Sequence, residues 1–544
     1  MSPPRTLLRI VSRILRAQTT GMLGAETHRG TTLASCVVSL EGFPMPVPWR
    51  LLASIAVIVL VTALGTGCAT VPPPSRAEIQ AKALGNLDLA GAWEAGNPQE
   101  GAVQDNWIAT FSDEKLTVLV KEALENNLDL QIAASRVEQA AGYVDVAQAA
   151  LYPSLNLFGS RRAKIRGGGS ELSSPVQALE LGISWEPDVW GRVRYGRNAA
   201  QEAYASAKAD FEFARQSLAA LVTDVWFVAT QTWLQQQLGE QIIQAAEELV
   251  RIAEKRYEVG IGNEQDVASA RANLGNYQDA MRQVAFAHER ALRALEVLLG
   301  RYPSADIEAR KDLPPLPGPV PAGMKVDILE RRPDVTAAER RVAAAFNRVG
   351  ESKAARLPRI SLNTNIGLLD VDSINFKMRL PRIAQNPASA ILSTRRIEVE
   401  KSVDNPTGSM DAGLYFPVYE GGALKAQVEI RNAEQREAIA DYARTVLAAL
   451  DDVENALGLA KALSEREVVL HQVVADSQIA LDHAMANFNI GRQDPRIVQL
   501  YQMDLHEARI TLLLVQTEQL RQRVKLHLAL GGSFEVPTEP APTD

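Results

Sequence analysis

The stretches of this chain that could do chemistry are few. Residues 329–335 read LERRPDV, where adjacent arginines could bind an anion. Residues 166–170 read RGGGS, but this glycine-rich run lacks the lysine and the following hydroxyl of a phosphate-binding loop. Because it lies between two candidate strands, a mobile extracellular loop is the better interpretation. The six histidines, His28, His288, His471, His483, His506 and His527, show no zinc-site spacing. No catalytic triad or nucleophile elbow is visible, so neither an enzyme nor a metal site is expected.

The composition favours long helices over a nucleic-acid-binding surface. The chain has 544 residues and a net charge of -8, with 57 basic and 65 acidic residues mixed along it. Because a nucleic-acid partner usually requires a basic face, none is expected. Only 6% of residues are aromatic, and alanine, glutamine, glutamate and arginine dominate the long segments, which favours helix.

One cysteine is placed where it could carry a lipid. Residues 51–64, LLASIAVIVLVTAL, have the length of a signal-peptide core and are short for a membrane helix. GTGC follows and ends at Cys68, as in a bacterial lipobox, although Gly65 stands where a large aliphatic residue is usual. We expect residues 45–67 to be a lipoprotein signal and Cys68 to carry a diacylglycerol and an N-acyl chain. An ordinary cleaved signal and a plain membrane anchor are the alternatives.

Residues 1–44 fit poorly in front of such a signal, and Met45 would give a compact start, so we expect a misassigned start or an extension. Ala69 after the cysteine, in place of aspartate, suggests passage to the outer membrane. No disulfide is expected, because Cys36 would then be absent from the mature chain. Residues 68–104 would be a lipidated tail, and residues 534–544 a disordered tail.

The chain is predicted to contain two copies of one unit. LENNLDL at 124–130 matches LERRPDV, and YPSLNL at 152–157 matches LPRISL at 357–362, both 205 residues apart. RYEVG ending at Gly260 matches NFNIG ending at Gly491, 231 residues apart. Repeat 1 then covers 105–301 and repeat 2 covers 324–533, with a proline-rich linker at 302–323. The jump in spacing places an insertion in the second copy, at 370–408, where it could fold over a mouth, contact lipopolysaccharide or form a plain surface loop.

Each unit reads as a helix, two strands and a long helical hairpin. No proline occurs between Pro187 and Pro303, and heptad-like apolar spacing recurs there. A single helix over 191–258 would be roughly 100 Å long at about 1.5 Å per residue, which suits a coiled-coil tube. Several shorter helices are the alternative.

The expected strands, at about 153–188 and 358–417, alternate apolar and polar residues. In ALELGISWEP, the apolar residues Leu179, Leu181, Ile183 and Trp185 share one face. Such alternation over about 10 residues is typical of membrane β-strands, although a soluble, half-buried hairpin would show it too. Four strands cannot close a barrel in lipid, where unpaired backbone groups are costly, so several chains must share one. Two chains would give eight strands and a filled interior, whereas three would give twelve and room for a pore.

Taken together, the lipobox-like signal, the duplicated unit, LERRPDV and the paired RYEVG and NFNIG turns resemble the outer-membrane efflux lipoproteins of the TolC/OprM (NodT) type. The resemblance covers roughly 105–533. It implies a mainly α fold with a small β part: a homotrimer with an α-barrel and a β-barrel and four membrane strands per chain. It also implies an exit duct in the outer membrane that extends into the periplasm. The implied partners are a periplasmic adaptor protein, an inner-membrane transporter of the resistance-nodulation-division type and outer-membrane lipid, with no cofactor apart from the Cys68 lipid.

By that resemblance, the two glycine turns form the periplasmic tip, where the duct closes and the adaptor docks. Asp266 matches a family aspartate that bonds across neighbouring helices, whereas Ile497 and Leu500 stand where the second copy often has aspartates. The resemblance thus points to a set of tip residues: Arg256, Tyr257, Gly260, Asp266, Phe488, Gly491, Arg492, Gln493, Asp494 and Arg496. For Arg492, Gln493, Asp494 and Arg496, closing contacts and a solvated turn are both open.

Three functions remain to be compared. The first is a passive export channel, the second a lipid-anchored periplasmic coiled-coil scaffold without a pore, and the third a lipid-anchored enzyme. The alternating strands favour the channel, because a scaffold has no need of them at matching places in both repeats. LERRPDV then restarts the fold after the linker, with Pro333 at the first helical position and Asp334 in the first turn. Arg331 and Arg332 could pair with carboxylates between repeats or subunits, or face water.

Overall fold

The protein is described by a computed structural model that places residues 70–85, 91, 93–95, 101, 103, 105–162, 165–167, 170–172, 176–371, 376–381, 394–399 and 403–535. The extension at 1–44, the signal at 45–67, Cys68, part of the tail at 68–104 and the last nine residues, 536–544, lie outside the described residues. All described residues belong to one compact unit, Gly67–Asp544.

The two repeats have helices of equal length. The first helices are α5 (Leu128–Ala149) and α9 (Pro333–Ala354), each of 22 residues. The long helices are α6 (Arg192–Glu258) and α10 (Ala423–Asn489), each of 67 residues. Their return partners are α7 (Glu264–Leu298) and α11 (Pro495–Ala529), each of 35 residues. The alternative of several shorter helices over 191–258 is therefore wrong.

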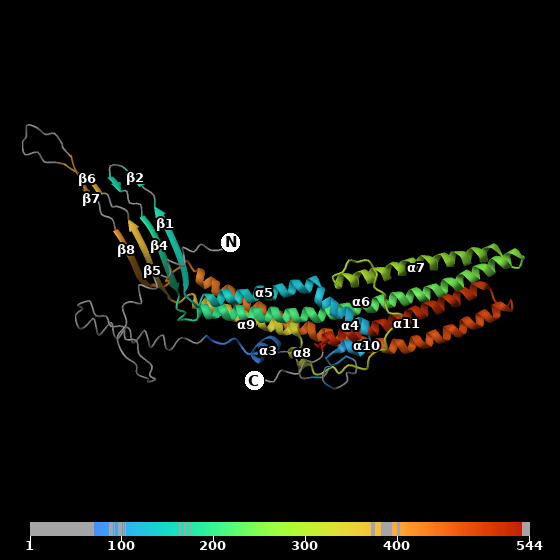
Figure 1. Cartoon of the computed structure of the whole chain (residues 1–544). Coiled ribbons are helices and arrows are strands. Elements are labelled where there is room, and N and C mark those ends of the chain that lie inside the picture. Colours follow the sequence, from blue (N-terminus) through green and yellow to red (C-terminus); the bar gives the residue numbers. More distant parts are fainter. Residues whose placement is uncertain are drawn as a thin grey trace, which may run out of the picture. The chain divides into compact units, whose positions relative to one another are not determined.

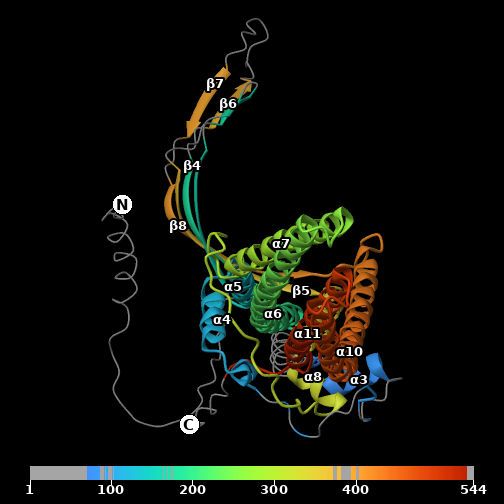
Figure 2. The ribbon, with the colours of Figure 1, turned by 90° about the vertical axis from the view of Figure 1, so that its right-hand side faces the viewer.

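The long helices lie side by side. Helix α6 packs against α7 and α9, and α10 packs against α11 and α9, as Figures 1 and 2 show. Because α6 also contacts α11, the helical hairpins of the two repeats form one bundle. Within the described ranges, none of the helices combines the length and the apolar character needed to cross a lipid bilayer.

The repeats differ at their beginnings. Repeat 1 opens with the 3-10 turn η1 (Trp107–Phe111) and helix α4 (Glu114–Asn126). At the equivalent place repeat 2 has only η2 (Lys325–Asp327) and the four-residue α8 (Ile328–Arg331). The prolines of the linker explain the difference, because they remove backbone donors that a longer helix would need. The linker itself has no helix between Arg301 and Met324.

The two largest of four apolar clusters stabilise the bundle. The first gathers Trp107, Phe111, Trp226 and Phe227 between η1, α4 and α6. The second packs the N-terminal helix α3 (Arg76–Leu84) against α9 and α10, with Tyr442 at its centre. The linker contributes Ile307 to the first core and Val320 and Ala322 to the second. It therefore fastens both repeats although it forms no helix.

Four strands form one antiparallel sheet in the order β1-β4-β5-β8. The strands are β1 (Ser154–Arg162), β4 (Val176–Trp185), β5 (Arg359–Val371) and β8 (Val403–Tyr415). Strands β4 and β5 join the two repeats, with Leu181 opposite Ile366. Within the described residues, β1 and β8 each have one unpaired edge.

Two smaller hairpins extend this sheet, which the sequence did not predict. One consists of β2 (Ile165–Gly167) and β3 (Ser170–Leu172), so the RGGGS run belongs to a hairpin. The other consists of β6 (Phe376–Pro381) and β7 (Thr394–Val399), inside the expected insertion at 370–408. The remainder of that insertion, apart from the ends of β5 and β8, lies outside the described residues.

Candidate functional site

The sheet has one apolar and one polar face, because alternate residues of a strand point to opposite sides. Leu155, Leu181, Ile366 and Met410 lie on the apolar face, and all but Leu181 are more than half exposed. On the other face the Ser184 hydroxyl donates to Asn363 Oδ1 at 2.8 Å. A monomer in water would not leave such a surface uncovered, so the apolar face fits lipid.

Exposed aromatic side chains gather where the strands meet the helices. Trp185 Nε1 donates to the Leu151 carbonyl at 2.9 Å, and Trp190 Nε1 donates to the Pro358 carbonyl at 2.7 Å. The group comprises Tyr152, Trp185, Trp190, Tyr415, Phe416 and Tyr419. Amphipathic rings at one end of an apolar band are typical of a membrane–water interface.

The tip turns of the two hairpins have the same backbone geometry. Gly260 and Gly491 have φ values of +76° and +75°, a left-handed conformation that glycine adopts without steric cost. In the first turn the Ile261 amide donates to the Arg256 carbonyl at 3.0 Å, and in the second the Arg492 amide donates to the Asn487 carbonyl at 2.9 Å. Both glycines thus reverse the chain between a long helix and its partner.

The structure brings five of the predicted tip residues together across the two repeats. Arg496 binds Asp494 through two hydrogen bonds of 3.1 and 2.8 Å, and its Nε lies 3.8 Å from Asp266 Oδ1. The Arg256 guanidinium lies over the Phe488 ring, 5.5 Å from its centroid. The hydrogen bond from Arg496 is the largest cause that lowers the pKa of Asp494. Arg496 therefore links a helix of repeat 2 to a helix of repeat 1.

Asp266 is the least satisfied member of this tip cluster, which comprises Arg256, Asp266, Phe488, Asp494 and Arg496. Its Oδ1 is buried and accepts no hydrogen bond, although its backbone amide is capped by Asn263 at 2.8 Å. By contrast, no side-chain hydrogen bond or ion pair of Tyr257, Arg492 or Gln493 is found in the part of the chain that the structure describes. Tyr257 and Arg492 are exposed, so these residues are available to other chains.

LERRPDV is a junction between helices. Arg332 has extended backbone angles between α8 and α9, and Pro333 is the first residue of α9. The buried guanidinium of Arg332 donates to Asp334 at 3.0 and 2.7 Å, to Asp452 at 3.0 Å and to the Ala529 carbonyl at 3.2 Å. The neighbouring Arg331 binds Asp105 at 2.7 Å. Both arginines therefore pair with carboxylates of their own chain.

Repeat 1 makes the same junction with different chemistry. Asn127 Nδ2 donates to the Leu298 carbonyl at 3.0 Å, which is the counterpart of the contact between Arg332 and Ala529. Asn127 also caps α5 by accepting the Leu130 amide at 3.0 Å. Arg332 cannot accept such a bond, and Pro333 compensates by removing one amide donor from the first turn.

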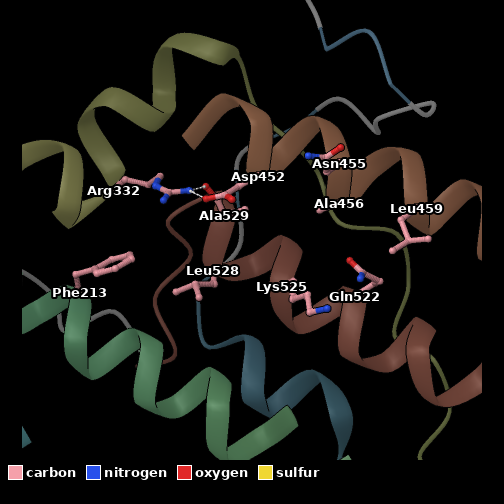
Figure 3. A pocket seen from close by; sticks show the side chains of 10 residues that line it. All are labelled: Phe213, Arg332, Asp452, Asn455, Ala456, Leu459, Gln522, Lys525, Leu528 and Ala529. Atoms are coloured by element: carbon pink, nitrogen blue, oxygen red, sulfur yellow. Dashed lines mark hydrogen bonds and ion pairs between the residues drawn. The ribbon is translucent and has the colours of Figure 1, made fainter. Parts of the chain in front are cut away.

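A groove of about 350 Å³ lies beside this junction (Figure 3). Its lining comprises Phe213, Arg332, Asp452, Asn455, Ala456, Leu459, Gln522, Lys525, Leu528 and Ala529. Because Arg332 is already bound to two carboxylates, the groove offers little to an anion, and the anion-site reading of LERRPDV does not hold. Among the described residues, no group of three or more histidine, cysteine, aspartate or glutamate side chains could hold a metal ion.

No sequence pattern indicated two buried groups that stabilise the junctions. Glu296 accepts the Ala305 and Asp306 amides at 2.6 and 2.7 Å, which holds the start of the linker. His527 stacks on Trp107 with ring centroids 5.8 Å apart. Neither residue belongs to a motif, so only the packing identifies them.

Comparison with known proteins agrees with this architecture. The family model described as "Outer membrane efflux protein" matches residues 119–301 and 326–532. The chain is 26% identical over 481 residues to the pyoverdine export outer membrane protein OpmQ of Pseudomonas putida, covering 86% of this chain and 95% of that protein. It is 27% identical over 482 residues to the cation efflux system protein CusC of Escherichia coli, covering 86% and 96%.

Solved structures show the same fold. The outer-membrane channel OprN superposes with a TM-score of 0.71 at 25% identity, covering 86% of this chain and all of that chain. CusC superposes with a TM-score of 0.67 at 23% identity, covering 81% and 100%. The expected mainly helical, TolC-like fold with four strands is thereby confirmed. The chain belongs to the outer membrane efflux protein family and is a non-enzymatic outer-membrane channel of an efflux system.

Proposed function

We propose that three copies of this chain form one closed export duct that crosses the outer membrane and extends into the periplasm. The unpaired edges of β1 and β8 carry this proposal. Open sheet edges are not tolerated in lipid, so β1 of one copy must pair with β8 of the next. Twelve strands from three copies leave room for a pore, which eight strands from two copies would not.

The helices support the same assembly. Leu128, Ile132, Tyr143 and Val146 are exposed along α5, although each is apolar or aromatic and the four recur at helical spacing. A second copy would cover this stripe and close the helical part of the duct. The scaffold alternative leaves the apolar face of the sheet without a purpose, so the duct explains more of the structure.

The described N-terminus supports a lipid anchor at Cys68. The Val71 amide donates to the Tyr195 hydroxyl at 2.9 Å, and Thr70 packs against Gly191, at the end of the sheet where α6 begins. Cys68 precedes Thr70 by two residues, a reach of about 7 Å along an extended chain. An acyl chain on Cys68 would therefore start near the level of the aromatic residues that mark the membrane surface.

This anchor gives a direct prediction. Cells supplied with labelled palmitate should incorporate it into the wild-type protein and not into Cys68→Ser. Cys36→Ser is the matched control and should label like the wild type. Equal labelling of the wild type and Cys68→Ser would contradict lipidation at Cys68.

The tip turns are the proposed docking site for a periplasmic adaptor that connects the duct to an inner-membrane transporter of the resistance-nodulation-division type. The exposed Tyr257 and Arg492 support this role, because they leave side chains free for a partner. The relatives are named for pyoverdine, toluene, antibiotic and cation export, so we propose that the transporter, and not the duct, selects the cargo.

Resting conductance in planar bilayers tests the duct and its closed tip. Asp266→Ala removes a carboxylate beside Arg496 in each of three subunits. Because Arg496 is half exposed, its pair with Asp266 contributes about 0.5 to 1 kcal/mol. Three such pairs bias the closed state by about 2 kcal/mol, so the resting conductance should rise roughly tenfold or more.

Glu264→Ala is the control, because it removes an exposed carboxylate two residues away and should leave the resting conductance unchanged. Equal conductance of Asp266→Ala and the wild type would contradict the role of the tip cluster. A different result, a solubilised protein that is monomeric and never conducts, would contradict the shared duct itself.

A further inference from the structure

Side chains of α7 and α11 join the two helical hairpins beyond the tip cluster. Asn273 Nδ2 donates to Gln499 Oε1 at 3.0 Å. Further from the tip, the Tyr277 ring packs edge-on against the His506 ring, with centroids 6.4 Å apart. Each hairpin is held by extensive packing between its own two helices, whereas α7 and α11 touch over a short stretch. Separation of the two hairpins therefore has to break these few contacts.

His506 is the member of this contact that can change its charge near neutral pH. Its ring is partly buried, and burial lowers its pKa. The charge of Arg509, one turn along α11, lowers the pKa of His506 as well. Burial raises the pKa of the Tyr277 hydroxyl, which therefore stays neutral. While the helices are packed, His506 is neutral too, and the contact joins two uncharged rings.

No carboxylate of the described helices compensates a proton on His506. Its charged neighbour is Arg509, which donates to Gln478 on α10 at 2.7 Å. Acidic side chains on the surrounding stretches of α6, α7, α10 and α11 are exposed to water instead: Glu247, Glu248, Asp279, Asp482, Asp504 and Glu507. Water and salt screen such exposed charges. A proton on His506 would thus place a second positive charge beside Arg509 in a partly dry contact.

We propose that His506 makes the contact between the two hairpins pH-sensitive, so that its protonation in mild acid favours the open tip. This inference rests on the proposed function, because it concerns the resting state of the duct. Once the hairpins separate, water reaches His506, and its pKa returns toward the ordinary value of about 6.5. The open tip then binds the proton at a higher pH than the closed tip does. Linkage therefore stabilises the closed tip above about pH 6.5 and shifts the equilibrium toward the open tip as the pH falls below that value.

Resting conductance of the full-length protein in planar bilayers, compared at about pH 7.5 and about pH 5.5, tests this proposal. Over this range linkage favours opening by at most about tenfold for each subunit, so the conductance of the wild type should rise about fivefold or more. His506→Phe preserves the ring contact and cannot be protonated, so its conductance should be the same at both pH values. Asp494 stays ionised over this range, because its hydrogen bond with Arg496 lowers its pKa.

His483→Phe is the matched control, because it changes an exposed histidine on α10 and should retain the rise in acid. His506→Arg places a permanent charge in the contact and should raise the conductance already at the higher pH. An equal rise in the wild type and in His506→Phe would overturn the proposal.

Asp266→Ala separates this inference from the proposed duct. If Asp266→Ala conducts more than the wild type while acid leaves the wild type unchanged, the duct stands and the pH-sensitive contact is wrong. A protein that conducts in none of these variants at either pH would contradict the duct, and the inference with it.

Discussion

Replacing Arg332 with alanine is expected to lower the free energy of unfolding by about 3 kcal/mol. The substitution removes a buried cation that binds Asp334, Asp452 and the Ala529 carbonyl. Breaking a buried ion pair by removing one partner costs about 3 to 5 kcal/mol, because the other charge is left unpaired. The lower figure applies, since Asp452 is half exposed and keeps part of its hydration. Urea unfolding of the detergent-solubilised protein, followed by helical circular dichroism, measures the loss.

Arg340→Ala is the control for this prediction. Arg340 also lies on α9 and pairs with Glu202, at 3.4 Å, but it is much more exposed than Arg332. Exposed ion pairs contribute about 0 to 1 kcal/mol to the free energy of unfolding, so the urea concentration at the unfolding midpoint should change little. If both alanine variants unfold at the same urea concentration, the junction around Arg332 is not a main source of stability.

Acidification from pH 6.5 to pH 4 is expected to reduce stability by about 3 kcal/mol through His527 alone. Burial, together with the charge of Arg523, lowers the pKa of His527 to about 4, whereas an unfolded histidine titrates near 6.5. The unfolded chain therefore binds this proton at a higher pH than the folded chain does. The stabilisation is fully present above pH 6.5 and is lost as the pH falls to about 4.

His527→Phe should reduce the loss of stability between pH 6.5 and pH 4, because phenylalanine preserves stacking on Trp107 and cannot be protonated. The Nδ1 atom of His527 is buried without a hydrogen-bond partner. Replacing it with a carbon atom of phenylalanine therefore leaves no other group at that position unpaired. His471→Phe changes an exposed histidine on α10 and serves as the control. A decline that is equally steep in the wild type and in His527→Phe would show that His527 does not cause it.

Much of this fold could be predicted because its signals are local. Helix α6 continues through 67 residues that contain no proline, and Gly260 ends the hairpin arm at the position that its sequence motif indicated. The alternation in Leu179–Trp185 indicated a strand with one apolar face, and Pro333 indicated the start of α9. Such patterns depend on neighbours a few residues away, through the helix and strand periodicities.

The sites could be predicted only in part. The glycine turns indicated where the tip lies, and the structure joins Asp266 of one repeat to Arg496 of the other. The role of this cluster in closing the duct remains a prediction. No local signal indicated that Tyr257 and Arg492 would stay exposed, because exposure depends on which helices pack beside them.

By itself, the sequence indicated the duplication, the long helix over 191–258, the alternating strands and the family to which the chain belongs. Only the tertiary structure decided which distant residues meet: Arg332 with Asp452, and Trp107 with His527. The physical reason is range. Helix and strand periodicities depend on residues within one or two turns of each other along the chain. The partner of a buried charge or ring is instead determined by packing between segments up to hundreds of residues apart.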